Sequence, residues 1–322
     1  MQLSLRRLQP RTVLLILLAL TLVAIAAFMT LGAKGSWSFI LPFRGTKLAA
    51  LLLVAYAVAV STVLFQTVTN NRILTPSIMG FDALYLLIQT TLVFFLGSRE
   101  LNLIDPQLRF VFEVAAMVVF SGLLFRWLFT GGGRSLHLLV LVGIVFGVLF
   151  RSLSSFMQRI LDPNEFMVLQ DAFFASFNTI DPTLLTISAA IIGVASVVGW
   201  CMMHTFDVLA LGRPTAINLG VDHQRTVTII LVLVAVLVSV STALVGPVTF
   251  FGLLVANLAH VLVGTSRHKF VLPAAVLLGA ICLVGGQVVL ERVFAFDTAL
   301  SIVIEFAGGL VFIFLILRGA AR

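Results

Sequence analysis

The sequence predicts an all-α polytopic membrane protein, a single transmembrane domain over residues 1–322 with about ten transmembrane helices. Of its 322 residues, 61% are apolar and only 10% are charged. In soluble domains about 45–50% of the residues are apolar and about 25% are charged. About 20 apolar residues cross a bilayer as one helix, so ten spans use roughly 200 residues and leave roughly 120 for loops. The basic residues that give a net charge of +7 are scattered, which suits a membrane better than a nucleic-acid surface. The composition therefore argues against a disordered chain, a nucleic-acid-binding module and an ordinary soluble enzyme.

Ten apolar segments, each bounded by charged residues, glycine or proline, are the expected spans. They are residues 12–33, 48–69, 78–97, 110–130, 136–154, 183–203, 226–245, 248–264, 270–290 and 298–317. The first follows Arg6, Arg7 and Arg11 and, at 22 residues, is too long for the core of a signal peptide, so we expect a retained helix. The seventh and eighth share one uncharged stretch of 41 residues, which must turn at Gly246-Pro247. The helix after this turn either spans the membrane or packs inside the protein.

The basic residues also predict which side each loop faces. With both termini in the cytoplasm, the inner segments hold 12 Lys and Arg residues and the outer segments hold 8, which is the direction of the positive-inside bias. The outer loop 151–181 is long and amphipathic, which suits a short helix on the membrane surface. The inner loop 204–225 has short apolar runs that end at glycine, which predicts a structured cytoplasmic knob of short helices.

Motifs for catalysis and metal binding are missing from the sequence. None of the three lysines follows a glycine, so there is no Gly-Lys-Ser/Thr phosphate loop, and neither HExxH nor GxSxG occurs. The five histidines include no pair at the spacing of helical metal ligands. Cys201 and Cys282 lie in apolar runs, as buried small side chains do. We expect a transport subunit rather than an enzyme, with no catalytic residue, no metal site and no cofactor of its own.

Three acidic residues fall inside expected spans, where ionisable side chains are rare and often functional. Glu305 is the clearest, because Ser301, Glu305 and Gly308 recur at helical spacing and share one face. Such a face suits a helix that lines a translocation path or packs closely against a partner. Glu113 in the fourth span and Asp82 near the start of the third are the other two. The alternative for each of these three acidic residues is a position near the membrane interface or a pairing with another side chain of the protein.

Four segments resemble the iron-siderophore and vitamin B12 class of ABC importer permeases, the FecCD-type family. They are RGTKLAALLLVAYAVAVSTVLFQTVTNNRILTPSIMG (44–80), FDVLALGRPTAINLGV (206–221), GPVTFFGLLVANLAHVLVG (246–264) and IEFAGGLVFIFLIL (304–317). These segments extend over nearly the whole chain in the family's order and spacing. The resemblance implies a type II importer permease in the inner (plasma) membrane of a bacterial cell, which moves ferric siderophore complexes into the cytoplasm.

The resemblance also implies partners: a second permease subunit, two cytoplasmic ATP-binding cassette subunits that use ATP and Mg²⁺, and an extracytoplasmic siderophore-binding protein. Residues 206–221 correspond to the family's coupling helices, which sit in a groove of the ATPase and transmit its closure. A short rigid helix suits this role because it transmits a push that a flexible loop would absorb. The expected coupling residues, within the segment 204–225, are Leu209, Leu211, Gly212, Arg213, Ala216, Leu219 and Gly220.

On the outer face, the resemblance implies docking of the binding protein. Arg44 and Arg292 occupy places where related permeases carry arginines that meet acidic residues of the binding protein, and Lys47 shares this interpretation. A guanidinium group suits pairing with carboxylates. The alternative for each is an anchor for lipid headgroups at a helix end. In this family the fifth and tenth spans line the central path, which adds interest to Glu305.

The chain also departs from the family pattern. Where many members read Asn-Pro-Leu-Ala-x-Pro, it reads NRILTP at 71–76, and the Gly-Ala that follows is replaced by Phe81-Asp82-Ala83-Leu84. This variant resembles the subgroup in which two different permeases form a heterodimer for catecholate or mixed-type siderophores. The second permease is therefore expected to be a non-identical chain, and a homodimer is the weaker alternative.

Other functions fit parts of the same pattern. A ten-helix secondary carrier driven by protons would use Glu305, Glu113 or Asp82 as its proton site. Such carriers commonly have inverted repeats, and the two halves of this sequence show no recognisable repeat. A membrane-embedded scaffold would use the inner knob as a docking site only. Within the resembled family, cobalamin and haem are alternative substrates.

Overall fold

The computed structural model describes residues 9–32, 36–101, 103–129, 136–294 and 299–317, and no strand occurs in these ranges. The described helices are α1 (Pro10–Thr30), α2 (Trp37–Thr69), the 3₁₀ helix η1 (Pro76–Met79), α3 (Phe81–Leu101), α4 (Pro106–Phe129), α5 (Leu136–Ile160), α6 (Pro163–Asp171), α7 (Pro182–Cys201), α8 (Met203–Leu209), α9 (Arg213–Asn218), α10 (His223–Val245), α11 (Phe251–Val263), α12 (His268–Arg292) and α13 (Leu300–Leu317). Residues 1–8 and 318–322, to which the expected position of the termini refers, lie outside this description.

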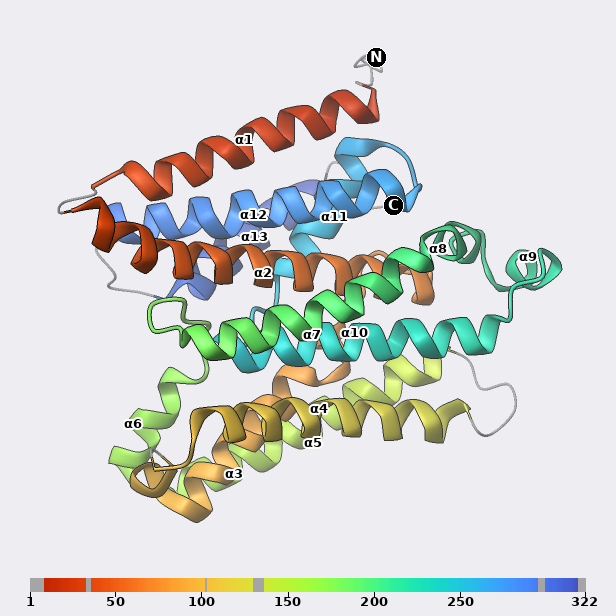
Figure 1. Ribbon diagram of the computed structural model, residues 1–322. Coiled ribbons are helices and arrows are strands. Elements are labelled where there is room, and N and C mark those ends of the chain that lie inside the picture. The colour runs from red at the N-terminus through yellow and green to blue at the C-terminus, as the bar shows by residue number, and fades with distance from the viewer. Residues whose placement is uncertain (1–8, 33–35, 102, 130–135, 295–298, 318–322) are drawn as a thin grey trace.

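The long helices run roughly alongside one another as a bundle (Figure 1). Helix α2 lies at its centre and contacts α12, α10 and α11. Ala50, Leu51, Val54 and Ala55 of α2 are completely buried, which the apolar and small side chains of this helix allow. Helices α1 and α12 pack on one side of α2, and α10 joins it to α4 and α7 on the other. Helices α3 and α5 pack together at the far edge.

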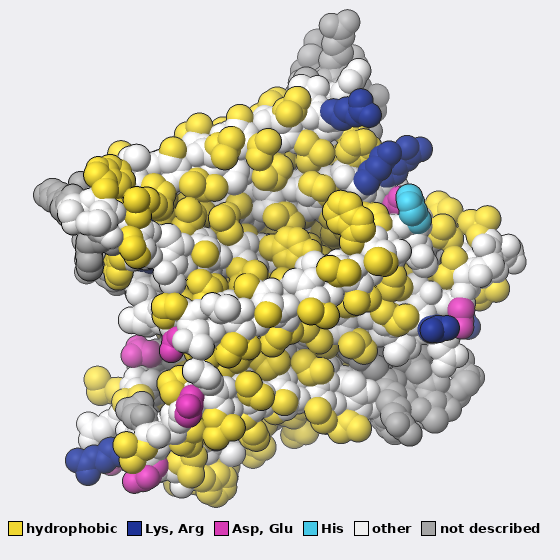
Figure 2. Space-filling model, in the orientation of Figure 1, with side chains coloured by type: hydrophobic (Ala, Val, Ile, Leu, Met, Phe, Trp, Pro, Cys, Tyr) yellow, Lys and Arg dark blue, Asp and Glu magenta, His cyan; other side chains and the backbone are white. Residues whose placement is uncertain are grey.

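All ten expected apolar segments are helices. Eight described helices are long and apolar enough to cross a membrane, and α11 and residues 300–310 of α13 are shorter apolar helices. These ten match the ten expected spans one to one, which confirms the all-α polytopic fold. Apolar side chains cover the face of the bundle shown in Figure 2, while charged side chains gather toward its ends. Leu15, Leu123 and Trp200 are 67%, 61% and 77% exposed, as expected for side chains that face lipid.

Two spans extend furthest beyond their predicted bounds. Helix α2 begins at Trp37 rather than at residue 48, so Arg44 and Lys47 lie on the helix and not in a loop before it. Pro42 is tolerated there because it removes only one backbone hydrogen bond near the helix start. Helix α5 continues to Ile160, which shortens the outer loop expected at 151–181. Apolar composition marks where a helix lies in lipid, not where it ends in water.

The short helix expected in that outer loop is α6, and it packs against α3. The Glu165 carboxylate accepts hydrogen bonds from the backbone N–H of Ser98 at 2.6 Å and from its hydroxyl at 3.0 Å. The N-cap Asp162 accepts from the backbone N–H of Asn164 at 2.9 Å. The contact with α3 is therefore polar as well as apolar.

The long uncharged stretch turns where proline and glycine predict. Helix α10 ends at Val245, and Gly246 follows with a φ of 95°, which favours glycine. Helix α11 has 13 residues, about 20 Å at 1.5 Å per residue, and a hydrocarbon core is about 30 Å thick. Nine of the 13 are buried. Of the two alternatives for the eighth segment, the structure shows a helix packed inside the protein.

Candidate functional site

Helices α8 and α9 form the inner knob, which projects at one end of the bundle between α7 and α10 (Figure 1). They have seven and six residues. Gly212 lies between them with a φ of 93°, and Gly220 follows α9 with a φ of 84°. Residues with a side chain rarely adopt these angles. The two glycines therefore fix the directions in which the chain enters and leaves α9.

The expected coupling residues divide into an anchored and an exposed group. Leu209 and Ala216 are 4% and 0% exposed and join the core cluster that includes α2, α3 and α10. Leu211 and Leu219 are 61% and 59% exposed, and Arg213 is exposed as well. Exposed leucines beside a basic residue, outside the bundle, suit a protein partner. Ile217 is 50% exposed on the same knob, although it was not among the coupling residues expected from the sequence.

A cluster of polar contacts joins the knob to two membrane helices. The Asp207 carboxylate of α8 accepts hydrogen bonds from the backbone N–H of His268, the first residue of α12, at 2.8 Å and pairs with its ring Nδ1 at 2.7 Å. The ring Nε2 of His268 lies 2.7 Å from the hydroxyl oxygen of Thr67 in α2. The His268 ring also packs edge-on against Phe206, with ring centroids 5.7 Å apart. We call Asp207, His268 and Thr67 the α8–α12–α2 link.

The carboxylate of this link also serves as a cap. Since the first N–H groups of a helix have no partner within it, a carboxylate there is favoured by hydrogen bonding and by the helix dipole. Partial burial acts to raise the pKa of Asp207, but the hydrogen bonds from His268, with the electrostatic effect of His268 and Arg267, hold the pKa below its ordinary value. Asp207 is therefore held as an anion at neutral pH.

At the opposite end of the bundle, two of the expected docking residues meet at the end of α1. Arg44 donates hydrogen bonds to the carbonyl oxygens of Phe28 and Leu31, at 2.5 and 3.0 Å. Arg292, the last residue of α12, donates to the same Leu31 carbonyl. Cations are favoured at a helix C-terminus, where carbonyl groups have no partner in the helix. Arg292 is exposed and Arg44 is half-buried.

Lys47 lies deeper than these arginines. It is 7% exposed, and its Nζ is 2.8 Å from Glu291 Oε1. A direct contact with a docking partner would require Lys47 to leave Glu291. The surface here is hollowed by a cavity of about 470 Å³. Its lining residues are Gly32, Phe43, Arg44, Lys47, Asn178, Glu291 and Arg292.

The three path residues expected on the last span face different surroundings. Ser301 is 2% exposed, and a Cβ on Gly308 would lie 3.3 Å from Leu254 Cδ2 of α11. Glu305 is half-buried, and its carboxyl group interacts with the backbone and side chain of Thr249. In the chain alone, Ser301 and Gly308 therefore pack inward, and Glu305 reaches the turn between α10 and α11.

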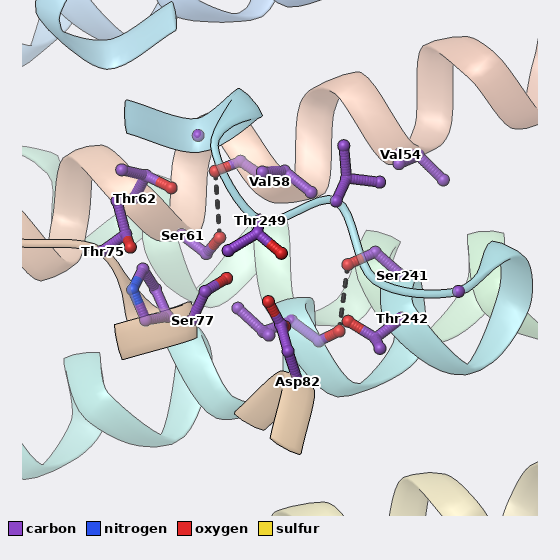
Figure 3. A pocket seen from close by; sticks show the side chains of 15 residues that line it. Val54, Val58, Ser61, Thr62, Thr75, Ser77, Asp82, Ser241, Thr242 and Thr249 are labelled. Carbon is purple, nitrogen blue, oxygen red and sulfur yellow. Dashed lines mark hydrogen bonds between the residues drawn. The ribbon is translucent and has the colours of Figure 1, made fainter. Parts of the chain in front are cut away.

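A small polar cavity lies beside that turn (Figure 3). Its volume is about 20 Å³, enough for a single water molecule, which needs about 10–15 Å³. Asp82 points into it and is 9% exposed, and Ser77 and Thr249 interact with its carboxyl group. Asp82 Oδ2 nevertheless has no hydrogen-bond partner among the described atoms. The seven hydroxyl side chains around it are Ser61, Thr62, Thr75, Ser77, Ser241, Thr242 and Thr249.

Of the polar side chains in this cavity, sequence reasoning singled out only Asp82 as a candidate. Ser61-Thr62 and Ser241-Thr242 are adjacent hydroxyl pairs that interrupt apolar spans, and this signal could have identified them. Two of these hydroxyls bond within their own helices: Ser61 donates to the Val58 carbonyl at 3.1 Å, and Ser241 to that of Val238 at 3.0 Å.

Glu113 is accounted for within the fold. It is 3% exposed, and its Oε1 lies 2.8 Å from Nε of Arg109 one turn earlier in α4. Arg109 also donates to the side-chain oxygen of Gln89 in α3. Glu113 is therefore paired within its own helix, as the alternative interpretation of the sequence held, and Arg109 ties that helix to α3.

The polar residues of this bundle either meet at its two ends, where partners could bind, or lie between its helices within the membrane. That is the organisation of a membrane transport permease. The chain belongs to the FecCD transport family, which matches residues 11–318. The family assigned from the sequence is confirmed, and with it a transport subunit rather than an enzyme.

Comparison with individual proteins gives the same family. The Petrobactin import system permease protein YclO of Bacillus subtilis (strain 168) is 48% identical over 310 residues, which cover 96% of this chain and 98% of YclO. The Petrobactin import system permease protein YclN of the same strain is 25% identical over 296 residues, 90% of this chain and 89% of YclN. An inward-facing structure of a metal-chelate type ABC transporter shares the fold, with a TM-score of 0.82 and 23% identity over 96% of this chain and 100% of that chain.

Proposed function

We propose that this chain is a permease subunit of an ATP-binding cassette importer that moves ferric siderophore complexes into the cytoplasm. The similarity to YclO supports this substrate class, since YclO is named for petrobactin import and matches the chain from end to end. Petrobactin is therefore the first siderophore to test. The chain makes or breaks no bond in its substrate, because its role is to open a path alternately to each side.

The observation that carries the proposal is the anchored inner knob. Its exposed side chains, Leu211, Arg213 and Leu219, face away from the bundle, and we assign them to contact with an ATPase subunit. Its buried side chains, Leu209 and Ala216, hold it to the membrane helices. Movement of the ATPase would pass through α8 to α12 and α2, because the α8–α12–α2 link joins them by hydrogen bonds.

The outer end suits a binding protein that presents carboxylates. Arg44 and Arg292 lie together beside a hollow, and charged docking gives correct orientation and a faster encounter more than raw affinity. Lys47 lies beneath this surface, where its ion pair with Glu291 joins α2 to α12. Of the expected path residues Ser301, Glu305 and Gly308, the half-buried Glu305 is assigned to the central path of the assembled importer, while Ser301 and Gly308 pack α13 against its neighbours.

The second permease subunit is proposed to be a non-identical chain. YclO and YclN are two proteins of one strain with the same system name, and this chain is 48% identical to one and 25% to the other. The start of α1 and the end of α13 lie at the same end of the bundle as the knob (Figure 1). This arrangement supports cytoplasmic termini. ATP and Mg²⁺ are assigned to the two ATPase subunits, and no cofactor to this chain.

The proton-driven alternative is less well supported. Of its three candidate proton sites, Glu113 is paired with Arg109, and Ser77 and Thr249 surround Asp82 in a cavity of about 20 Å³. The third, Glu305, is half-buried and interacts with Thr249, so each of the three carboxyl groups is accounted for by contacts within the chain. A scaffold without transport would give no reason for a link between the knob and α2.

Uptake into proteoliposomes tests the proposal. The vesicles would hold this chain, the second permease and two ATPase subunits, with the binding protein and labelled ferric petrobactin outside. We expect uptake that requires ATP inside the vesicles, on the side of the ATPase subunits, and that a proton uncoupler does not affect. Uptake without ATP that an uncoupler abolishes would establish the carrier instead. Uptake of labelled cobalamin or haem in place of ferric petrobactin would refute the siderophore assignment.

A further inference from the structure

An apolar groove runs along the face of the bundle between α2, α7, α10 and α12, and it is visible as a hollow in Figure 2. Its volume is about 360 Å³, and nearly all of its lining is apolar. On α2 it extends from Tyr56 to Leu64, about 12 Å at 1.5 Å per residue. The groove therefore runs along the helices, inside the hydrocarbon region, and opens toward lipid.

Small residues on α7 open this groove. Ala195, Ser196 and Gly199 line it, and a Cβ placed on Gly199 would meet no atom within 4 Å. Trp200, which is 77% exposed, stands at its rim, as aromatic side chains do at the membrane interface. The space is long and apolar, which matches a hydrocarbon chain.

Basic side chains lie at the cytoplasmic end of the groove. Lys269 is four residues before Pro273, a groove residue of α12, so the two share one face of the helix. Arg267 and Lys269 are exposed, and His204 adjoins the groove residue Met203. Figure 2 shows basic side chains and a histidine together at this end. The nearby Asp207 carboxylate interacts electrostatically with Arg267 and offsets one of these positive charges, which leaves the charge of Lys269 in excess.

We propose that this groove binds one acyl chain of an anionic phospholipid from the inner leaflet, with its phosphate headgroup held by Arg267 and Lys269. Acyl chains are as apolar as the groove, so moving one from bilayer to protein gains little free energy. The headgroup must then give the selectivity, because basic pockets between membrane helices on the cytoplasmic side attract anionic lipids. The lipid would touch Met203 and Phe206 of α8, at the base of the inner knob.

The test uses the purified full-length chain in nanodiscs of equal phosphatidylglycerol and phosphatidylcholine, with retained lipid counted by native mass spectrometry. Lys269→Gln should lower the ratio of retained phosphatidylglycerol to retained phosphatidylcholine about fivefold. This is the contribution to binding expected of one basic residue near an anionic membrane surface. Arg225→Gln is the matched control, because Arg225 is exposed on the same side but outside the groove. It should leave the ratio unchanged.

A second pair of variants tests the acyl chain. Gly199→Leu should fill the groove and abolish retention of both lipids. Gly193→Leu is its control: it lies on the same helix, a Cβ there also meets nothing within 4 Å, and it does not line the groove. A free phosphate or other small anion would still bind Gly199→Leu, so loss of binding in that variant identifies a lipid. Equal retention by Gly199→Leu and wild type, or an unchanged lipid ratio in Lys269→Gln, would overturn the proposal.

Discussion

The α8–α12–α2 link gives the sharpest test of how the inner knob works. Asp207→Ala removes a carboxylate that accepts two hydrogen bonds from His268, at 2.8 and 2.7 Å. A hydrogen bond to a charged group contributes about 1.5–3 kcal/mol when buried. The Asp207 side chain is 35% exposed, so water replaces part of this, and we take about 1–2 kcal/mol for the attachment. That is a factor of about 5–30 in the ratio of attached to detached α8.

The assay measures iron imported per ATP hydrolysed in proteoliposomes. Since a loosely attached α8 would absorb the push of the ATPase, Asp207→Ala should still hydrolyse ATP but import several-fold less iron per ATP. Because the pKa of Asp207 is lowered, the carboxylate's contribution is complete above the ordinary carboxyl pKa of about 3.9 and is lost only as pH falls through the lower folded value. The effect should therefore be constant across neutral pH.

Asp222→Ala is the matched control. Asp222 also caps a helix, accepting from the backbone N–H of Arg225 at 3.1 Å, but it stabilises only its own α10. Its loss costs about 1 kcal/mol of helix stability without detaching α8 from α12. An unchanged iron-to-ATP ratio in Asp207→Ala, or an equal fall in Asp222→Ala, would refute the idea that this link transmits movement.

Three further outcomes are expected. Gly212→Leu should insert normally but hydrolyse ATP without uptake, since leucine is strained at a φ of 93°; normal uptake would contradict the coupling role. Arg292→Glu should weaken docking of the binding protein most at low salt, and an unchanged affinity there would remove Arg292 from the docking surface. Gly80→Ala should lower stability by about 1–3 kcal/mol in thermal unfolding, because its Cβ would lie 2.9 Å from Gly147 Cα. Gly122→Ala, with nothing within 4 Å, should instead stabilise its helix slightly, and equal losses would contradict the packing argument.

Sequence reasoning located the spans because the bilayer itself selects for uncharged apolar runs. It found the turn at Gly246 and the glycine-ended helices of the knob because proline and glycine act locally. It placed the start of α2 11 residues too late, since Arg44 and Lys47 looked like the end of a loop. In the structure these two residues lie on the helix and bond to α1 and α12.

Contacts between distant helices could not be read from the sequence. Asp207 and His268 are 61 residues apart, and no local pattern indicates that one caps the helix of the other. The same holds for the hydroxyl side chains around Asp82, which come from α2, from η1 and the residue before it, and from α10 and the turn that follows α10. Such sites depend on how helices pack, which hydrophobic periodicity constrains only weakly.

Helix α12 is held at both ends by side chains made much earlier, which has a consequence for biosynthesis. Glu291 pairs with Lys47 across 244 residues, and His268 pairs with Asp207 across 61. A ribosome adds about 5–20 residues per second, so Lys47 waits about 10–50 s in the nascent chain before Glu291 exists. During that time α2 must be kept in the membrane, by the insertion machinery or by lipid, with its lysine still lacking this partner.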